Sequence, residues 1–136
     1  MKPAKNLKAS VLAVLKAHRK LDAFTTPGEG FHVAVQSPGY MDLVIERHGD
    51  RVTISHYFQQ NGDMVADPDV EFYIAGDFEW YPVAMQTQWG YHVCLEFEAG
   101  KMTRQNPTTA KDILAFTNVW ARNIKEQGFS TGTLRK

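Results

Sequence analysis

The sequence predicts an α+β fold, an antiparallel meander of about six strands with an N-terminal and a C-terminal helix packed on one face. Helical spacing of apolar residues occurs only near the two ends of the chain. Between the ends, short runs of alternating apolar and polar residues succeed one another with no intervening helix, which argues against a doubly wound parallel sheet. The length of 136 residues fits one core, so we expect residues 1–136 to form a single domain.

The first predicted element is a helix over residues 6–21. Leu7, Val11 and Val14 follow one another at helical spacing and share one face, whereas the lysines fall mostly on other faces. We expect the lysine side chains to be solvated rather than to anchor the chain to a membrane. The Pro and Gly residues of segment 25–30 end the helical pattern.

Residues 31–104 are expected to form the sheet. Apolar side chains alternate with polar ones there, as they do on strands with one buried face. Turn-forming residues such as Gly, Pro, Asn and Asp separate the runs. The segments with strand character are 31–35, 41–46, 52–59, 70–74, 79–87 and 91–97.

The last predicted element is a helix over residues 108–127. Thr109 followed by Asp112 resembles a capping box, in which the two side chains bond the first free amides of a helix. Apolar residues then recur at helical spacing, and Gly128 is a natural stop. The short tail over 129–136 is rich in small and charged residues, and we expect it to be frayed.

The charges balance overall but are sorted along the chain. Fifteen Lys and Arg residues stand against fifteen Asp and Glu residues, yet none of the basic ones lies between Arg51 and Lys101. That segment holds eight of the acids and ten of the sixteen aromatic residues. It forms either a solvated acidic face or a surface that attracts a cation or a basic partner. Repulsion between carboxylates and phosphates disfavours direct nucleic-acid binding through it.

The sequence shows no feature of an exported or membrane-bound protein. No apolar run reaches the roughly 20 residues that span a bilayer, and the lysine-interrupted start does not resemble a signal peptide. We therefore expect a cytoplasmic protein with no membrane partner. The single Cys94 excludes an intramolecular disulfide and a Cys-rich zinc site. Nucleophile-elbow and nucleotide-binding motifs are absent from the sequence, and we expect no cofactor.

Acidic residues gather after the third predicted strand. Asp63, Asp67 and Asp69 lie close together, and the Asn61-Gly62 pair before them is typical of a tight turn. Carboxylates this close are solvated, share a proton or hold a cation such as Mg²⁺. The spacing does not match an EF-hand, so a solvated loop and a metal site both remain as interpretations.

His56 and the aromatic residues of the middle segment each allow two interpretations. The period-two pattern places His56 on the face of Val52 and Ile54, which is the expected core face. A histidine there is either a buried, hydrogen-bonded group or a ligand or base. The region around Trp80 and Trp89 either packs within the sheet or lines a pocket or an interface.

A His-Tyr pair at His56-Tyr57 is followed by Gln-Asn-Gly-Asp over 60–63 and by Asp-Pro at 67–68. The segment 40–98 that contains this signature resembles a family of small uncharacterised bacterial proteins. Genes of that family are often found on plasmids, phages and other mobile elements. The resemblance implies no activity. It marks as the defining feature His56, Tyr57, Asn61, Gly62, Asp63, Asp67 and Pro68.

Two functional hypotheses follow. The first is a non-enzymatic binding or accessory module of a mobile element that engages a basic partner through an acidic, aromatic surface; the cation-free middle segment favours it. The second is a divalent-metal-dependent hydrolase or nuclease that uses the Asp63, Asp67 and Asp69 loop with His56 as base. A homodimer through edge strands or the aromatic face is compatible with the sequence. The candidate binding residues are His56, Tyr57, Asn61, Gly62, Asp63, Asp67, Asp69, Trp80 and Trp89.

Overall fold

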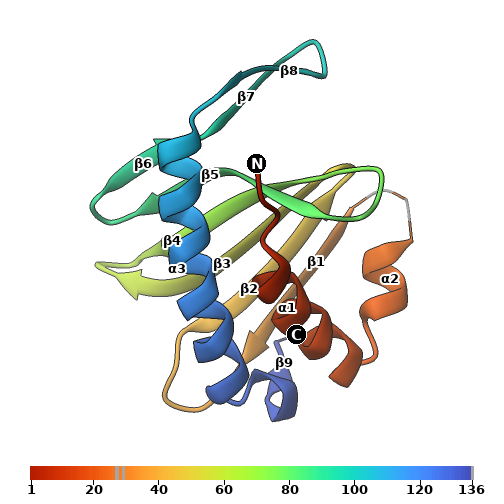
Figure 1. Ribbon diagram of the computed structural model, residues 1–136. Coiled ribbons are helices and arrows are strands. Elements are labelled where there is room, and N and C mark those ends of the chain that lie inside the picture. Colours follow the sequence, from red (N-terminus) through yellow and green to blue (C-terminus); the bar gives the residue numbers. More distant parts are fainter. Residues whose placement is uncertain (27, 29, 136) are drawn as a thin grey trace.

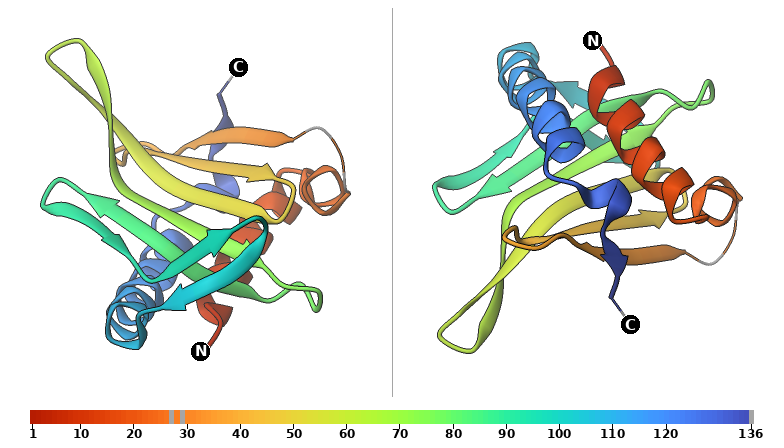
Figure 2. Two further views of the ribbon diagram at one scale, coloured as in Figure 1. Left: turned by 90° about the horizontal axis from the view of Figure 1, so that it is seen from above. Right: turned by 90° about the horizontal axis from the view of Figure 1, so that it is seen from below.

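A computed structural model of the chain describes residues 1–26, 28 and 30–135, without the side chains of residues 58–60, 64 and 66. The fold is α+β, as the sequence predicts (Figure 1). A seven-stranded antiparallel sheet carries two long helices on one face, and a small two-stranded sheet lies across part of the other face (Figure 2). We call the face without helices the open face.

The main sheet follows the predicted meander. Its strand order is β6-β5-β4-β3-β2-β1-β9, and every neighbouring pair is antiparallel. These strands are β1 (Phe31–Gln36), β2 (Asp42–His48), β3 (Arg51–Gln60), β4 (Asp63–Ile74), β5 (Trp80–Thr87), β6 (Gly90–Val93) and β9 (Thr133–Leu134). The small sheet pairs β7 (Leu95–Glu98) with β8 (Lys101–Gln105).

The N-terminal helix is shorter than predicted and is followed by a second short one. The helices are α1 (Lys5–Ala17) and α2 (Leu21–Thr25). The chain bends between them at Arg19, whose φ of 60° lies in the left-handed region and cannot continue a right-handed helix. Pro27 and Glu29, in the predicted break after these helices, lie outside the described residues.

The C-terminal helix α3 (Pro107–Glu126) lies where it is predicted but has a different cap. Asn106 is the N-cap residue, and its side-chain oxygen accepts a hydrogen bond from the Thr109 amide at 3.1 Å. The capping box predicted from Thr109 and Asp112 is therefore wrong, because the N-cap lies three residues earlier, at Asn106. Gly128, with a φ of 81°, ends the helical region as expected.

The tail after α3 is ordered, so the prediction of a frayed segment is wrong. Residues Phe129–Thr131 form a 3₁₀ turn, η1, and β9 then pairs with β1 through Val35 and Leu134. The Phe129 ring is fully buried, which anchors the turn through the hydrophobic effect. Lys136 lies outside the described residues.

The core lies between the helices and the sheet. Alternation along β3 directs Val52, Ile54 and His56 toward the helices, as the sequence predicts, and all three are buried. Leu7 of α1 and Ile113 of α3 meet this layer and have no exposed surface. In the described part of the chain, none of the helices has the length and apolarity required to cross a membrane.

Candidate functional site

Polar side chains cross the open face of the central strands in two neighbouring rows. One row contains Glu46 of β2, Thr53 of β3 and Glu71 of β4, which are direct cross-strand partners. The next row contains Ser55 and Asp69, paired in the same way. Residues in such a row lie about 4.8 Å apart, so their side chains share one environment. The register of the meander therefore gathers carboxylates from β2 and β4 over the small side chains of β3.

A concave surface of about 970 Å³ opens above β1 and β2 beside these rows. Its floor is made of small side chains such as Ala34 and Val44, and Val44 is only 7% exposed although no helix covers it. Tyr40 and Met41 stand on the rim and are 51% and 40% exposed. The lining residues are His32, Ala34, Gly39, Tyr40, Met41, Asp42, Val44, Glu46, Tyr57 and Arg135.

Two of the acids on the open face are paired with arginines. Arg135, which follows β9, donates two hydrogen bonds to Asp42, from Nε at 2.5 Å and from Nη2 at 3.1 Å. The Nε atom of Arg51 lies 3.2 Å from an oxygen of Glu71. Asp42 and Glu71 therefore each have a guanidinium partner, and Arg51 is shared between Glu71 and Asp50, which lies 2.8 Å from its Nη1 atom.

The other two acids lack such compensation. Glu46 lies 3.3 Å from Nε2 of His32, a ring that balances the carboxylate only when it is protonated. Asp69 has no cationic partner within 4.0 Å among the described residues. Burial raises the pKa of Asp69, and the nearby carboxylates of Glu46 and Glu71 raise it further.

Tyr57 takes part in the same electrostatic environment. Its backbone pairs with Asp42, and its ring lines the concave surface. Burial raises the pKa of the Tyr57 phenol, and the negative charge of Asp69 acts in the same direction. Titratable groups with perturbed pKa values in or beside a concavity are a mark of binding or catalytic sites. We therefore take the open face around Glu46, Tyr57 and Asp69 as the candidate functional site and call it the carboxylate face.

His56 lies on the opposite side of β3, inside the core. The indole Nε1 of Trp120 donates to Nε2 of His56 at 2.9 Å, which places the ring proton on Nδ1, where it faces the carbonyl oxygen of Asp42 at 3.2 Å. Burial lowers the pKa of His56, so the ring is neutral. With both nitrogens engaged, His56 ties α3 to the sheet.

The acids of the predicted loop are spread along β4. Asn61 and Gly62, with φ of 53° and 85°, form the two-residue turn between β3 and β4, and Asp63 is exposed beside it. The tip projects beyond the sheet (Figure 2). At about 3.3 Å per residue, Asp63 lies about 20 Å along the strand from Asp69. Among the residues described, no three His, Cys, Asp or Glu side chains are grouped as a metal ion would require.

The irregular segment between these acids contains Asp67 and Pro68. The register of β3 and β4 shifts between Ser55 and Tyr57, so both residues form a bulge opposite His56. The Asp67–Pro68 peptide bond is cis. The signature residues therefore occupy a turn, a bulge, the core and the open face, and they do not meet at one point.

The two candidate tryptophans have different surroundings. Trp80 is fully buried and packs on Phe72, with ring centroids 5.7 Å apart. Trp89 is 86% exposed and lies in the turn between β5 and β6, where its amide donates a hydrogen bond to Thr87 Oγ1 at 3.1 Å. Only Trp89 is therefore available to a partner.

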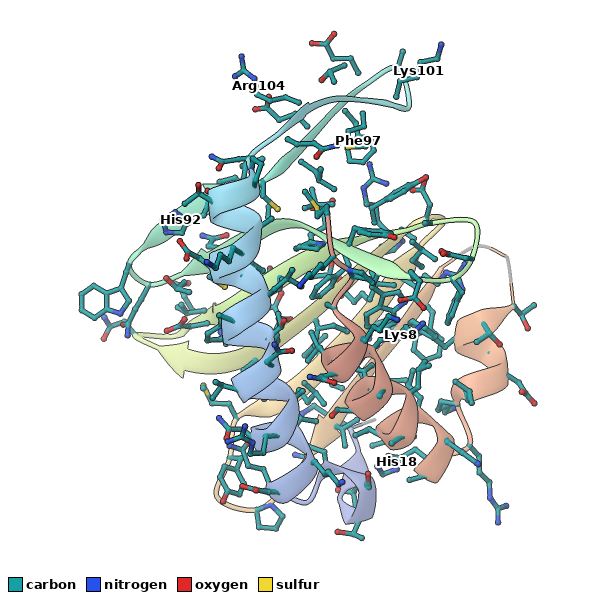
Figure 3. The ribbon with its side chains drawn as sticks, in the orientation of Figure 1. Lys8, His18, His92, Phe97, Lys101 and Arg104 are labelled. Carbon is teal, nitrogen blue, oxygen red and sulfur yellow. The ribbon has the colours of Figure 1, made fainter. Side chains whose placement is uncertain are left out.

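The β7–β8 hairpin covers one end of the open face. Phe97 lies on the side of the hairpin toward the sheet, while Lys101 and Arg104 point away from it (Figure 3). The Phe97 ring centroid is 5.3 Å from that of Tyr73 and 4.2 Å from the guanidinium carbon of Arg51. The hairpin thus limits the carboxylate face on the side of β4 and β5.

A family model described as Domain of unknown function (DUF6908) matches residues 9–130. The chain belongs to this family. The match agrees with a resemblance to an uncharacterised family, and it extends that resemblance from the middle segment to both long helices. No curated protein and no solved structure matches the chain.

Several residues of the carboxylate face in this DUF6908 domain are not among the sequence candidates. His32, Glu46 and Arg135 come from β1, β2 and the end of the chain, far in sequence from Asp69. Period-two alternation does put Glu46 opposite to Ile45, and hence on the face away from the core. What the sequence lacks is the register, which decides that Glu46 and Asp69 are neighbours.

Proposed function

We propose that this protein is a non-enzymatic binding module that engages a basic protein partner through its carboxylate face. The observation that carries the proposal is the pair Glu46, which lines the concave surface, and Asp69, which lies beside it on the open face. Neither carboxylate has an arginine or lysine partner among the described residues. Like charges held together in this way cost free energy in the isolated protein. A cationic side chain between them removes that cost.

The shape of the surface suits an extended basic segment. The floor residues Ala34 and Val44 are small, and so is Ser55, the cross-strand partner of Val44, which leaves space between the flanking acids. On the sheet, Glu46 and Asp69 lie one row (about 6.6 Å) and two strands (about 9.6 Å) apart, and alternate side chains of an extended chain lie about 6.6 Å apart. Arg or Lys side chains at alternate positions can therefore reach both Glu46 and Asp69.

The rim has the composition of a protein interface. Tyr40 and Met41 are exposed there, and aromatic residues and methionine are enriched at the centres of protein interfaces. Such side chains contribute contact area next to the charged pair. The resemblance to a family found on plasmids and phages supports a role as an accessory protein of a mobile element.

Fluorescence anisotropy with a labelled peptide of alternating Arg and Ser tests the proposal. We expect binding at about 50 mM salt that weakens as salt screens the charges. In the double variant Glu46→Gln and Asp69→Asn, affinity should fall at least about tenfold, or about 1.4 kcal/mol.

The matched control is Glu96→Gln with Glu98→Gln, two exposed acids of β7 that change the net charge by the same amount. The affinity of this control variant should stay within about threefold of the wild-type value. The control changes only the long-range attraction that depends on net charge and leaves the carboxylate face intact. An equal loss in both double variants, or no binding to the wild-type protein, would contradict the proposal.

A further inference from the structure

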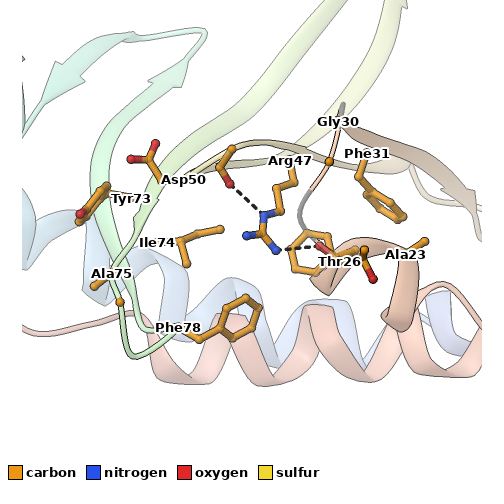
Figure 4. A pocket seen from close by; sticks show the side chains of 14 residues that line it. Ala23, Thr26, Gly30, Phe31, Arg47, Asp50, Tyr73, Ile74, Ala75 and Phe78 are labelled. Carbon is orange, nitrogen blue, oxygen red and sulfur yellow. Dashed lines mark hydrogen bonds between the residues drawn. The ribbon is translucent and has the colours of Figure 1, made fainter. Parts of the chain in front are cut away.

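A second cavity lies at the end of the sheet, on the other side from the carboxylate face. It has a volume of about 610 Å³, within the roughly 300–1,000 Å³ typical of small-molecule sites. Its walls come from α2, the turn between β2 and β3, and the turn between β4 and β5 (Figure 4). Phe31 and Phe78 supply aromatic surface, the lining residue Phe24 has a fully buried side chain, and Arg47 is the one lysine or arginine among the lining residues that the structure describes.

Arg47 is fixed in place by uncharged groups, and the acid Asp50, which also lines the cavity, pairs with Arg51 at 2.8 Å. The Nη1 atom of Arg47 donates to the carbonyl oxygen of Phe24 at 2.8 Å, and its Nε donates to that of Gly49 at 3.0 Å (Figure 4). The guanidinium carbon lies 5.7 Å from the Phe24 ring centroid and 5.8 Å from that of Phe78. Carbonyls and rings carry no net charge, and two of the five N–H groups have partners among the described residues.

Phe78, which forms part of the cavity wall, has an unusual backbone conformation. Its φ of 65° lies in the left-handed region, which a bulky side chain rarely adopts. Lys8 of α1 donates from Nζ to the Phe78 carbonyl oxygen at 3.1 Å and lies 5.5 Å from the ring centroid. Residues kept in such conformations concentrate at ligand-binding sites, where the surrounding structure fixes them.

Two glycines leave the rim of the cavity open. A Cβ atom placed on Gly28 or Gly76 would meet no atom within 4 Å, and neither residue has a left-handed φ. The backbone is therefore accessible to a ligand at both positions, and a side chain can be introduced there without strain. Gly76 lines the cavity, so a large side chain at this position occupies space at the rim.

We propose that this cavity binds a small molecule that joins an oxyanion to a flat apolar group. The oxyanion, a carboxylate or a phosphate monoester, takes the remaining N–H groups of Arg47, because a guanidinium fork matches both geometries. The flat group packs between Phe31 and Phe78. This site is independent of the carboxylate face, from which the sheet separates it.

Calorimetry on the full chain with benzoate, phenyl phosphate and the neutral isostere benzamide tests this site. We expect at least one anion to bind with a Kd in the millimolar range or below, and benzamide to bind at least about tenfold more weakly. Stronger binding of phenyl phosphate assigns the oxyanion as phosphate, and stronger binding of benzoate assigns it as carboxylate. Absence of binding by either anion, or equal binding of benzamide, overturns the proposal.

Substitution at Gly76 locates the binding. Gly76→Phe places a large side chain at the rim and should reduce the affinity at least about tenfold, whereas Val119→Phe, at an exposed position of α3 outside the cavity, should leave the affinity unchanged. Unchanged affinity in Gly76→Phe overturns the proposal. A second test uses the wild-type protein alone. The amide resonances of Gly28, Gly49 and Gly76 should shift on titration with the anion. Shifts confined to other regions of the protein overturn the proposal as well.

Discussion

The hydrogen bond between Trp120 and His56 should contribute measurably to stability. Trp120→Phe removes the indole donor that lies 2.9 Å from Nε2 of His56, a residue only 7% exposed. A buried acceptor left without a partner costs about 1–3 kcal/mol, and the smaller ring adds about 1 kcal/mol of lost burial. At about 2.1 cal/mol/K of unfolding entropy per residue, a loss of about 3 kcal/mol over 136 residues lowers Tm by about 10 °C.

Trp80→Phe is the matched control, because it removes an equally buried indole that makes no hydrogen bond. Trp80 is fully buried, and its Nε1 has no acceptor among the described residues. Urea unfolding at pH 7.5 should therefore show Trp120→Phe to be less stable than Trp80→Phe by at least about 1.5 kcal/mol. Equal losses in the two variants would refute the assignment of a hydrogen bond to His56.

The same assignment fixes the pH at which the comparison must be made. Burial lowers the pKa of His56 below its ordinary value of 6.5. The unfolded chain therefore takes up a proton more readily than the folded protein as the pH falls below about 6.5. The stability associated with neutral His56 is fully present above that pH and is lost as the pH falls toward the folded-state pKa. At pH 7.5 the measured difference in unfolding free energy therefore reports the hydrogen bond and not the protonation of His56.

Three further predictions concern stability and reactivity. Asp69→Asn should raise the free energy of unfolding at pH 7 by about 0.5 kcal/mol, because it removes a repelled carboxylate; since the folded-state pKa of Asp69 is raised, the gain should vanish in urea titrations below about pH 3.8. Cys94 should react with iodoacetamide at pH 8 only after unfolding, because burial raises the pKa of its thiol to about 11; rapid alkylation of the folded protein would be inconsistent with this. Phe129→Ala should cost about 3–5 kcal/mol in thermal unfolding, and a cost below about 1 kcal/mol would mean that the tail is not part of the core.

The fold class follows from local patterns that the sequence shows directly. Alternation along 52–56 puts His56 on the core face, and the Asn61-Gly62 pair forms the predicted turn. The strand β9 covers only Thr133–Leu134, which is too short to display a period, so the ordered tail is not visible in the sequence. Its place depends on tertiary contacts of Phe129.

The candidate site is only partly visible in the sequence for a related reason. Tyr57 and Asp69 are sequence candidates that reach the open face, but their neighbour Glu46 lies on another strand. Composition shows that carboxylates are concentrated in the middle segment, whereas the register of β2, β3 and β4 decides which of them are close. Arg135, which pairs with Asp42, is brought to the same face by β9.

The central claim is that a basic partner binds on the carboxylate face, and amide chemical-shift mapping with an Arg-Ser peptide tests it most directly. The account predicts saturable shifts at Val44, Glu46, Ser55, Tyr57 and Asp69, with the helices unaffected. Shifts centred on the β3–β4 tip, or on the outer surfaces of α1 and α3, would contradict it.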